Sequence, residues 1–296
     1  MFAACGDTDK QLRERAEVLC RYIPDHELLA ESKDYLTSDF YALLDTMFNL
    51  PEHEAMDHEW LYYFVTGNGG SMADCEVVEV VKSDRTHAVA TINVRQKWED
   101  GSFADPDDIE EHKLYMEKVD GEWLMSDFDG HKADCRRHID INRQEQKVRQ
   151  AIGNYLSDTI GPLYLKGDLC IPTLMIAAEE SDATHTRVYG DFWVMWYNIA
   201  GDTLKTISGG NHPGCIALLD EGGKLTVSSF EQVEDGAGND ASAKRIFGKH
   251  YDIFQNMHSN QKVREAARHE QIAEYIHRND IEIHYIQDFG WDAVEL

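Results

Sequence analysis

The chain has 296 residues, of which 42% are hydrophobic, and this is enough to build one large or two medium packed domains. Its 55 acidic and 28 basic residues give a formal net charge of −27, which is spread along the chain. Such a charge repels phosphate backbones and anionic lipid headgroups, so we expect no nucleic-acid partner. No apolar run approaches the roughly 20 residues that a membrane-spanning helix needs, and we therefore expect a soluble body.

The first seven residues, MFAACGD, resemble the end of a bacterial lipoprotein signal, where small residues precede the cysteine that is lipidated. Phe2 stands where leucine is usual, and no charged or apolar stretch precedes it. Two interpretations stay open. Either the similarity is chance, or residues 1–8 are a signal remnant and flexible tether, anchored by lipid on Cys5, and the folded part faces an aqueous compartment of a bacterial cell envelope.

Two helices are predicted at the start of the folded part. Apolar residues recur at helical spacing from Thr8 until Pro24 ends the run, and a second amphipathic run begins near Ser38 and stops before Pro51. The apolar face of the first helix is Leu12, Ala16, Leu19 and Ile23, and that of the second is Phe40, Leu43, Leu44 and Met47. The apolar faces of both helices must be buried, and we expect them to pack on a sheet.

Residues 75–81 and 88–98 are predicted strands, and a hairpin follows at 112–130. Asp120-Gly121 has the preference for positive φ that suits a two-residue turn between twisted strands. Apolar side chains alternate on either side of that turn, so one face of the hairpin can be buried; they are Leu114, Met116, Trp123 and Met125. Helices followed by an antiparallel sheet predict an α+β fold.

This order of elements, with the closing segment GEWLMSD at 121–127, resembles the nuclear transport factor two-like, or cystatin-like, superfamily. The resemblance covers roughly residues 10–138. It implies a bent sheet wrapped around an N-terminal helix to form a cone, which in that superfamily serves as an enzyme pocket, a ligand site or an interaction module. The resemblance carries over no catalytic residue by position.

A similar layout returns in the second half, with a Gly222-Gly223 turn in place of Asp120-Gly121. We expect a linker at 131–138 and a helix from Gln144, followed by strands at 169–177, 187–197 and 203–208, the hairpin, helices at 242–257 and 259–278, and a strand at 281–287. The predicted fold is α+β, with two tandem cone-like domains of helices and a curved antiparallel sheet. Their predicted bounds are 9–140 and 141–296, after the tether at 1–8.

The strand from Asp191 to Tyr197 is apolar on both faces, because Phe192, Val194 and Trp196 alternate with Trp193, Met195 and Tyr197. Such a pattern is typical of a strand packed on both sides. The alternative is that one face lines an aromatic ligand site, because buried indole and phenol groups need polar partners. The candidate ligand-binding residues are Asp191, Trp193, Trp196 and Tyr197.

The glycine-rich segment SGGNHPG, at 208–214, is the second candidate. Glycines let the backbone approach a ligand closely, and His212 can exchange a proton near neutral pH. Glycine-rich text before a strand is more often only a turn. His212 and Asp127 complete the set of candidate ligand-binding residues. If the protein is an enzyme, His212 would work with a carboxylate such as Asp127 or Asp191.

The histidines and the cysteine at 131, 135 and 138 would share one helix face and could hold a transition metal, but a solvated linker is the preferred interpretation. The six cysteines form no Cys-x-x-Cys pair, and one or two disulfides could form in an oxidising compartment. We expect no metal and no cofactor.

These observations favour a non-catalytic ligand-binding or protein-interaction protein of a bacterial cell envelope. The alternative is a small hydrolase or isomerase that uses a carboxylate and His212 in a cone-shaped pocket. The expected partner is a small molecule or another protein, with self-association as a homodimer as an option. Contact with a membrane is expected only through a lipid on Cys5.

Overall fold

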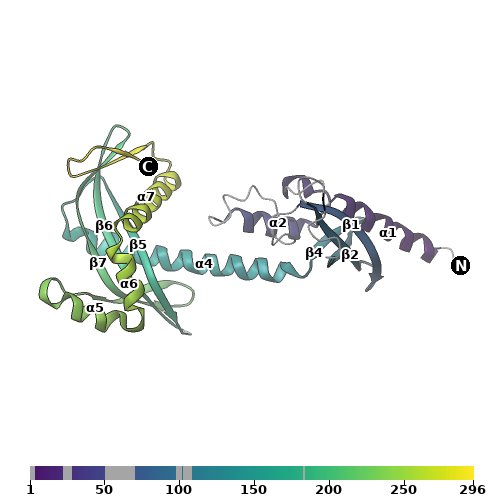
Figure 1. Cartoon of the computed structure of the whole chain (residues 1–296), viewed down its shortest axis with the longest axis horizontal. Helices are drawn as coiled ribbons and strands as arrows, with labels where there is room; N and C mark the ends of the chain where they lie inside the picture. Colours follow the sequence, from purple (N-terminus) through teal and green to yellow (C-terminus); the bar gives the residue numbers. More distant parts are fainter. Residues whose placement is uncertain (1–3, 23–28, 51–70, 98–101, 103–108, 183) are drawn as a thin grey trace. The chain divides into compact units, whose positions relative to one another are not determined.

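A computed structural model of the chain describes residues 4–22, 29–50, 71–97, 102, 109–182 and 184–296, with side chains in these ranges except at 4–9, 20–22, 71–74 and 96–97. The chain divides into two compact units, Met1–Arg143 and Gln144–Leu296, which we call unit 1 and unit 2. Each unit combines helices with a curved sheet (Figure 1), so the predicted α+β class is confirmed.

Unit 1 packs helices against a four-stranded sheet in which neighbours in the chain are neighbours in space, order β1-β2-β3-β4, and every pair is antiparallel. The elements are α1 (Ala4–Tyr22), a 3₁₀ turn η2 (Leu29–Ser32), α2 (Ser38–Phe48), β1 (Ser71–Lys82), β2 (His87–Lys97), β3 (Glu110–Val119) and β4 (Glu122–Phe128). Both predicted helices are confirmed. Residues 4–8, expected in the tether, are helical.

The core of unit 1 is formed by the predicted apolar faces. Leu12 and Ala16 of α1 and Phe40 and Leu44 of α2 are buried together with alternate residues of the strands, among them Ala88, Ala90, Ile92, Leu114 and Met116. Asp120 and Gly121 have φ values of 51° and 96°, as the predicted hairpin turn requires. The burial of every second strand residue leaves the opposite face of this sheet partly exposed.

Helix α4 runs from His131 to Tyr155 without a break, so the linker predicted at 131–138 is wrong. Asp127 stabilises the start of this helix, because its Oδ1 accepts the backbone N–H of Lys132 at 3.0 Å. The early turns bury Cys135 and Ile139 in the core of unit 1, and the later turns contribute apolar residues to the core of unit 2. Burial at both ends favours helix across the whole segment.

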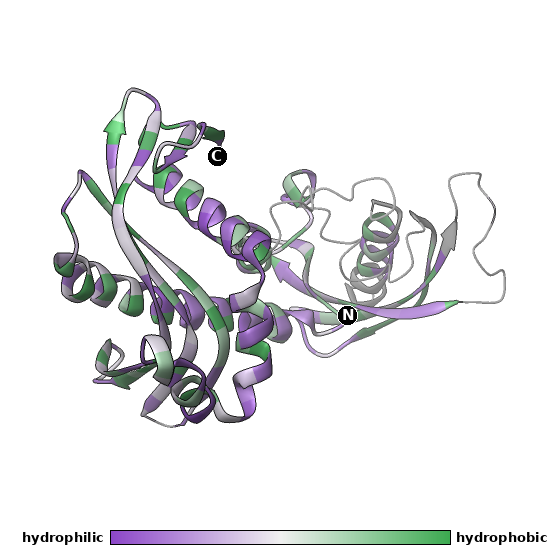
Figure 2. Cartoon of the chain, turned by 60° about the vertical axis from the view of Figure 1, so that its left-hand side comes forward, coloured by the Kyte–Doolittle hydropathy of each residue, from purple (hydrophilic) through white to green (hydrophobic). Residues whose placement is uncertain are grey.

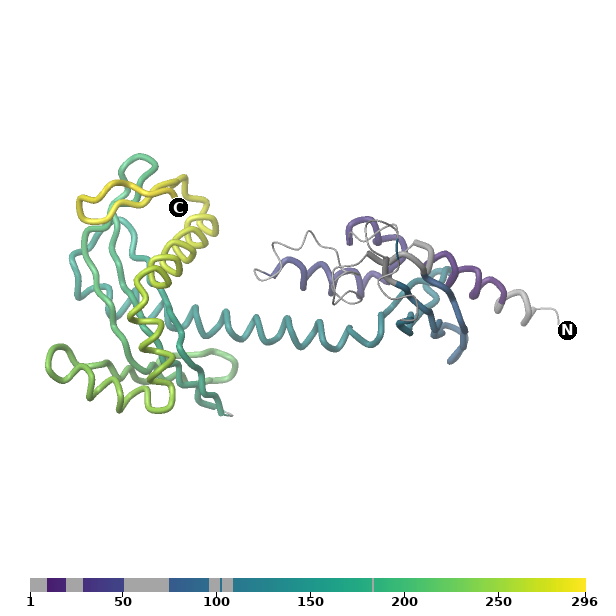
Figure 3. The backbone as a smooth tube through the Cα atoms, viewed as in Figure 1, coloured from purple at the N-terminus to yellow at the C-terminus, as the bar shows by residue number. Residues whose placement is uncertain are grey.

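Unit 2 contains a six-stranded sheet, in which five strands follow the order β10-β9-β7-β6-β5 and the sixth, β8, pairs with β7. All pairs are antiparallel except β7 with β9, which is parallel. The strands are β5 (Leu169–Ser181), β6 (His185–Ala200), β7 (Thr203–Asp220), β8 (Leu225–Gln232), β9 (Tyr285–Asp288) and β10 (Val294–Glu295). The backbone tube in Figure 3 shows the long curved course of β5 to β7.

The loop predicted at 208–214 lies inside β7, which is one continuous strand. Its glycines are needed for packing within the sheet. A Cβ on Gly209 would lie 2.2 Å from the carbonyl oxygen of Val194, and a Cβ on Gly210 would lie 2.4 Å from the hydroxyl of Tyr164. Gly209 also has φ +148°, which a larger residue rarely adopts. The glycine-rich segment therefore indicates a close approach of neighbouring groups to the backbone of a strand, where the sequence suggested a turn.

Helices cover both faces of the unit 2 sheet. The C-terminal part of α4 and a π turn, η4 (Leu156–Ile160), cover one face, and α6 (Tyr251–Ser259) and α7 (Gln261–Arg278) cover the other (Figure 1). The helix predicted at 242–257 is divided, because Gly248 has φ +49° and ends α5 (Asn239–Phe247) before α6 begins. Figure 2 shows polar and apolar residues alternating along α7, as expected of a helix with one buried face.

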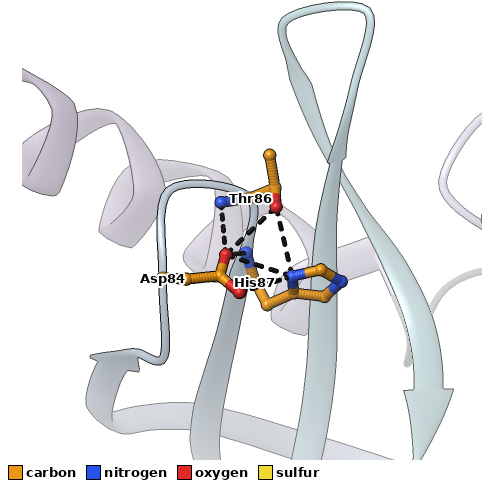
Figure 4. Close-up of polar contacts among 3 residues, drawn as sticks. All are labelled: Asp84, Thr86 and His87. Carbon is orange, nitrogen blue, oxygen red and sulfur yellow. Dashed lines mark hydrogen bonds and ion pairs between the residues drawn. The ribbon is translucent and has the colours of Figure 1, made fainter.

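One turn recurs in both units. The turn from β1 to β2 has the sequence Ser-Asp-x-Thr-His, and Asp84 Oδ1 accepts the backbone N–H groups of Thr86 and His87 at 2.7 and 2.8 Å (Figure 4). The same five-residue pattern joins β5 to β6, where Asp182 Oδ1 accepts two backbone N–H groups at 2.9 Å each. The backbone bond to Thr86 is the largest influence on the pKa of Asp84, which falls to about 2. Both carboxylates fix a local turn.

Within the described residues, no helix is both long and apolar enough to cross a bilayer.

Candidate functional site

The face of the unit 2 sheet beneath α6 and α7 carries two apolar clusters with polar residues between them. One cluster joins Tyr189 of β6 to Phe247 and Phe254 of the helices. The other joins Ile171 and Tyr197 of the strands to α7 and β9, through Ile272, Ile276 and Ile286. Asp191 and Trp193 lie on the same face of β6, between Tyr189 and Tyr197, because side chains alternate along a strand. The polar residues between the two apolar clusters, which we call the polar interval, therefore lie beneath the junction of α6 and α7.

Asp191 is fully buried at the floor of this interval. His258, near the C-terminus of α6, donates from Nδ1 to its Oδ2 at 2.7 Å. The imidazole side chain keeps 30% of its surface exposed and stacks on Phe254, with ring centroids 5.0 Å apart. The pair thus links a buried carboxylate to a group that reaches solvent. Asp191 Oδ1, the second carboxylate oxygen, accepts no hydrogen bond.

Four buried side-chain atoms in the described part of the chain have no hydrogen-bond partner, and all four come from this interval. Besides Asp191 Oδ1 they are Thr173 Oγ1, Trp193 Nε1 and Arg264 Nε. Thr173 of β5 stands directly opposite Trp193 of β6, so their Cβ atoms are about 5 Å apart. Trp193 and Asp191 are two residues apart on one strand face, or about 7 Å. Buried polar atoms are normally paired, and a group of unpaired ones in one place needs an explanation.

Arg264 of α7 covers the site. Its guanidinium carbon lies 5.4 Å from the centre of the Trp193 ring, a cation–π contact. Thr173 is fully buried like Asp191, whereas Trp193 and Arg264 are half-buried. The site therefore has a buried polar floor and a partly exposed rim. We call the five residues Thr173, Asp191, Trp193, His258 and Arg264 the polar site.

A buried ion-pair network borders the polar site one helical turn further along α7. Arg268 donates to both carboxylate oxygens of Asp288 at 2.7 Å, to Thr206 Oγ1 at 2.9 Å, and to the hydroxyl of Tyr197 at 3.0 Å. Burial acts to raise the pKa of Asp288, but the hydrogen bonds from Arg268 and Thr206 outweigh it, and the pKa is lowered. Burial raises the pKa of Tyr197. Every member is paired, so this network holds α7 on the sheet.

The sequence-predicted residues fall into separate groups. Asp191 and Trp193 belong to the polar site, and Tyr197 belongs to the Arg268 network. Trp196 lies on the opposite face of β6, where its Nε1 donates to the carbonyl of Gly161 at 2.9 Å. That bond gives the Trp196 indole a structural role.

His212 is also on the opposite face, because it stands across from Phe192 while Asp191 stands across from Pro213. Its Nδ1 donates to Gln232 Oε1 and its Nε2 accepts from the Tyr164 hydroxyl, each at 2.9 Å. The structure therefore does not bring His212 to Asp191. The imidazole beside that carboxylate belongs to His258.

The remaining predicted residues lie in unit 1. Asp127 accepts the backbone N–H of the neighbouring Phe128 and that of Lys132 in the first turn of α4, and the second bond is a helix-capping role. Cys5 lies in α1, and its side chain is outside the described residues. Cys135 is buried in the apolar core, and burial raises the pKa of its thiol to about 11, with Asp127 and Asp134 adding to the effect. A thiolate ligand is thereby disfavoured, and no group of metal-binding side chains occurs among the described residues.

Sequence reasoning missed three members of the polar site: Thr173, His258 and Arg264. One signal was available in α7. Arg264, Arg268 and Ile272 recur at intervals of four residues, so two arginines share the face that buries isoleucine. A charged residue on a buried helix face indicates a buried partner or a site. Thr173 and His258 gave no such signal, because their partners are distant in the chain.

Comparisons with known proteins give little further information. No family model matches the chain, and no match was found among curated proteins. Among solved structures, an "Ntf2 like protein involved in plasmid conjugation" is similar at 10% sequence identity, over 69% of this chain and 86% of that chain, with a TM-score of 0.19.

Proposed function

We propose that this is a non-catalytic binding protein with two domains, and that the polar site of its second domain holds a small polar molecule. The observation that carries the proposal is the group of four unpaired polar atoms at one place beneath α6 and α7. Leaving a buried polar group unpaired costs about 1–3 kcal/mol. A ligand that satisfies these atoms recovers that free energy on binding, and the half-buried Trp193 and Arg264 are the members of the site, with His258, that reach toward solvent.

We also propose a location in a bacterial cell envelope. Cys75 is disulfide-bonded, which supports an oxidising compartment because cytosolic thiols are kept reduced. The described cysteines at 135, 170 and 215 are free. Cys5 is proposed as the lipid anchor. Peptide mapping under non-reducing conditions tests both points, since a Cys5 joined to Cys75 could not carry a lipid.

Native mass spectrometry of the protein purified from its own host tests the binding function. We expect a bound small molecule in the wild type and its loss in Thr173→Val, which replaces the buried hydroxyl with a methyl group of similar size. Thr46→Val is the matched control, because Thr46 is exposed and donates only to the carbonyl of Ala42. The proposal is wrong if no small molecule is retained, or if both variants retain it equally. The same spectra show whether the protein forms a homodimer.

A second candidate function is a small hydrolase or isomerase. It is favoured by the 2.7 Å hydrogen bond between Asp191 and His258, because a carboxylate can orient an imidazole that acts as a general base. In this version His258 takes the place that the sequence gave to His212. If the protein is an enzyme, His258→Gln should abolish turnover of a bound molecule and His212→Gln should not. A binding protein would instead release its ligand chemically unchanged.

A further inference from the structure

We propose that the ligand of the polar site is a free α-amino acid, bound through its carboxylate and its ammonium group; this rests on the proposed binding function. Three of the four unpaired atoms can donate a hydrogen bond: Thr173 Oγ1, Trp193 Nε1 and Arg264 Nε. The fourth, Asp191 Oδ1, can only accept. A complementary ligand must offer several acceptor positions and at least one donor.

The charge of Arg264 limits which class of ligand fits the polar site. Among the described residues, no carboxylate is within ion-pair distance of Arg264, so its guanidinium is an uncompensated cation beside the site. A ligand carboxylate compensates it, and its four lone-pair positions can also accept from Trp193 and Thr173. Arg264 lies close to the N-terminus of α7, an 18-residue helix, whose dipole also favours negative charge.

Asp191 favours a ligand whose other end carries an ammonium group. Its carboxylate is fully buried, and its free oxygen lies on the floor of the site. A ligand ammonium group donates a hydrogen bond to that oxygen and compensates the negative charge of Asp191. His258 donates to the other oxygen of the same carboxylate. An organic acid without the ammonium would place its carboxylate near Asp191 with no cation between them. An amine without the carboxylate would leave Arg264 unpaired.

A neutral polyol satisfies the hydrogen bonds but neither charge. Hydrogen bonds to charged groups contribute more binding free energy than neutral ones. The amino acid should therefore bind at least about tenfold more tightly than a polyol of the same size. The side chain of the amino acid would extend toward the half-buried side chains of Trp193 and Arg264.

Isothermal titration calorimetry of the full-length protein with the twenty standard amino acids, added singly, tests this ligand class. The tightest binder is then compared with its des-amino acid, its decarboxylated amine, and glycerol. We expect the first two analogues to bind at least about tenfold more weakly than the amino acid, because each lacks one charged contact.

Two variants test the residue assignment. Arg264→Gln and Asp191→Asn should each weaken binding at least about tenfold, with Arg264→Gln mainly reducing discrimination against the amine and Asp191→Asn that against the des-amino acid. Arg278→Gln on the exposed end of the same helix is the control and should bind normally. If Asp191→Asn fails to fold, Thr173→Val replaces it, with a smaller loss expected.

The outcomes separate this inference from the proposed function. If no amino acid binds but native mass spectrometry shows another small molecule that Thr173→Val loses, the ligand class is overturned and the binding function stands. If neither is seen, both are overturned. Amino-acid binding that survives both Arg264→Gln and Asp191→Asn overturns the assignment to the polar site.

Discussion

Units 1 and 2 bury different chemistry beneath their sheets. In unit 1 the side chains between helix and sheet are mostly apolar, from Leu12 and Phe40 on the helices to Ile92 on the strands, and His112 of β3 is a buried exception. In unit 2 the face beneath α6 and α7 also holds Asp191 and Arg268, both buried. A consecutive meander of antiparallel strands occurs in each, so the strand topology does not account for the difference. The helices that follow the β7–β8 hairpin of unit 2 supply His258, Arg264 and Arg268.

The comparison indicates two uses for buried polar groups. Those of the Arg268 network are all paired and attach α7 to the sheet. Those of the polar site are partly unpaired, so the folded chain alone does not satisfy them. We infer that the first set contributes to stability and the second to binding, and the following predictions test that division from the largest expected effect to the smallest.

Arg268→Met should have the largest effect on stability. The substitution leaves Asp288 without its ion-pair partner and Tyr197 without its donor, and we expect the free energy of unfolding of unit 2 to fall by about 3 kcal/mol. Native-state hydrogen exchange of β6 amides in the full-length protein measures it. Arg278→Met, exposed on the same helix, should change little. Equal effects of the two substitutions would show that the network does not hold α7.

The double substitution Asp191→Leu with His258→Leu should keep or raise the stability of unit 2, by up to about 1 kcal/mol, because a buried hydrogen-bonded polar pair is often no more stabilising than apolar residues of similar size. The same exchange measurement applies, and ligand binding should be lost. A decrease comparable to that of Arg268→Met would contradict the division, since the polar site would then be a stabilising feature.

The pH dependence of unit 1 should come from His112, which lies between Asp129 at 2.5 Å and Glu110 at 3.3 Å. Burial acts to lower the pKa of His112, but the bonds to the two carboxylates raise it, and the pKa of Asp129 is lowered by the same contact, against the effect of burial. A raised histidine pKa stabilises the fold below the unfolded value of about 6.5, and a lowered aspartate pKa stabilises it above about 3.9.

Unit 1 should therefore be most stable between about pH 4 and 6.5, and lose stability as the pH rises through the folded pKa of His112 or falls through that of Asp129. Thermal unfolding of wild type and His112→Gln across this range measures the effect. In the variant, the stability of unit 1 should no longer fall as the pH rises above about 6.5. Identical profiles for the two proteins would assign the pH dependence to other groups.

The smallest effect is expected at the matching turns of the two units. Asp84→Asn and Asp182→Asn weaken bonds that are local to exposed turns, so the amides of Thr86, Thr184 and the following histidines should exchange faster, with no change in global stability. Hydrogen exchange of these amides is the measurement. A loss of global stability in one unit only would show that its turn does more than close a hairpin.

Local patterns in the sequence determined the α1 and α2 faces, the Asp120-Gly121 hairpin and the α+β class, because these depend on the spacing of neighbouring residues. The sequence also marked Asp191 and Trp193 on a strand with two buried faces. It did not reveal that Gly209 and Gly210 lie inside β7, or that α4 is continuous. Those features depend on contacts with Met195, Tyr164 and the core of each unit.

Only the tertiary structure decided which groups meet at the polar site. Asp191 and His258 are 67 residues apart in the chain, and their contact requires α6 to pack on β6. The choice between His212 and His258 depended on which face of the sheet each one reaches, and strand pairing sets that face. A sequence specifies side-chain chemistry and local periodicity directly, whereas the meeting of distant side chains follows from the packing of whole helices on a sheet.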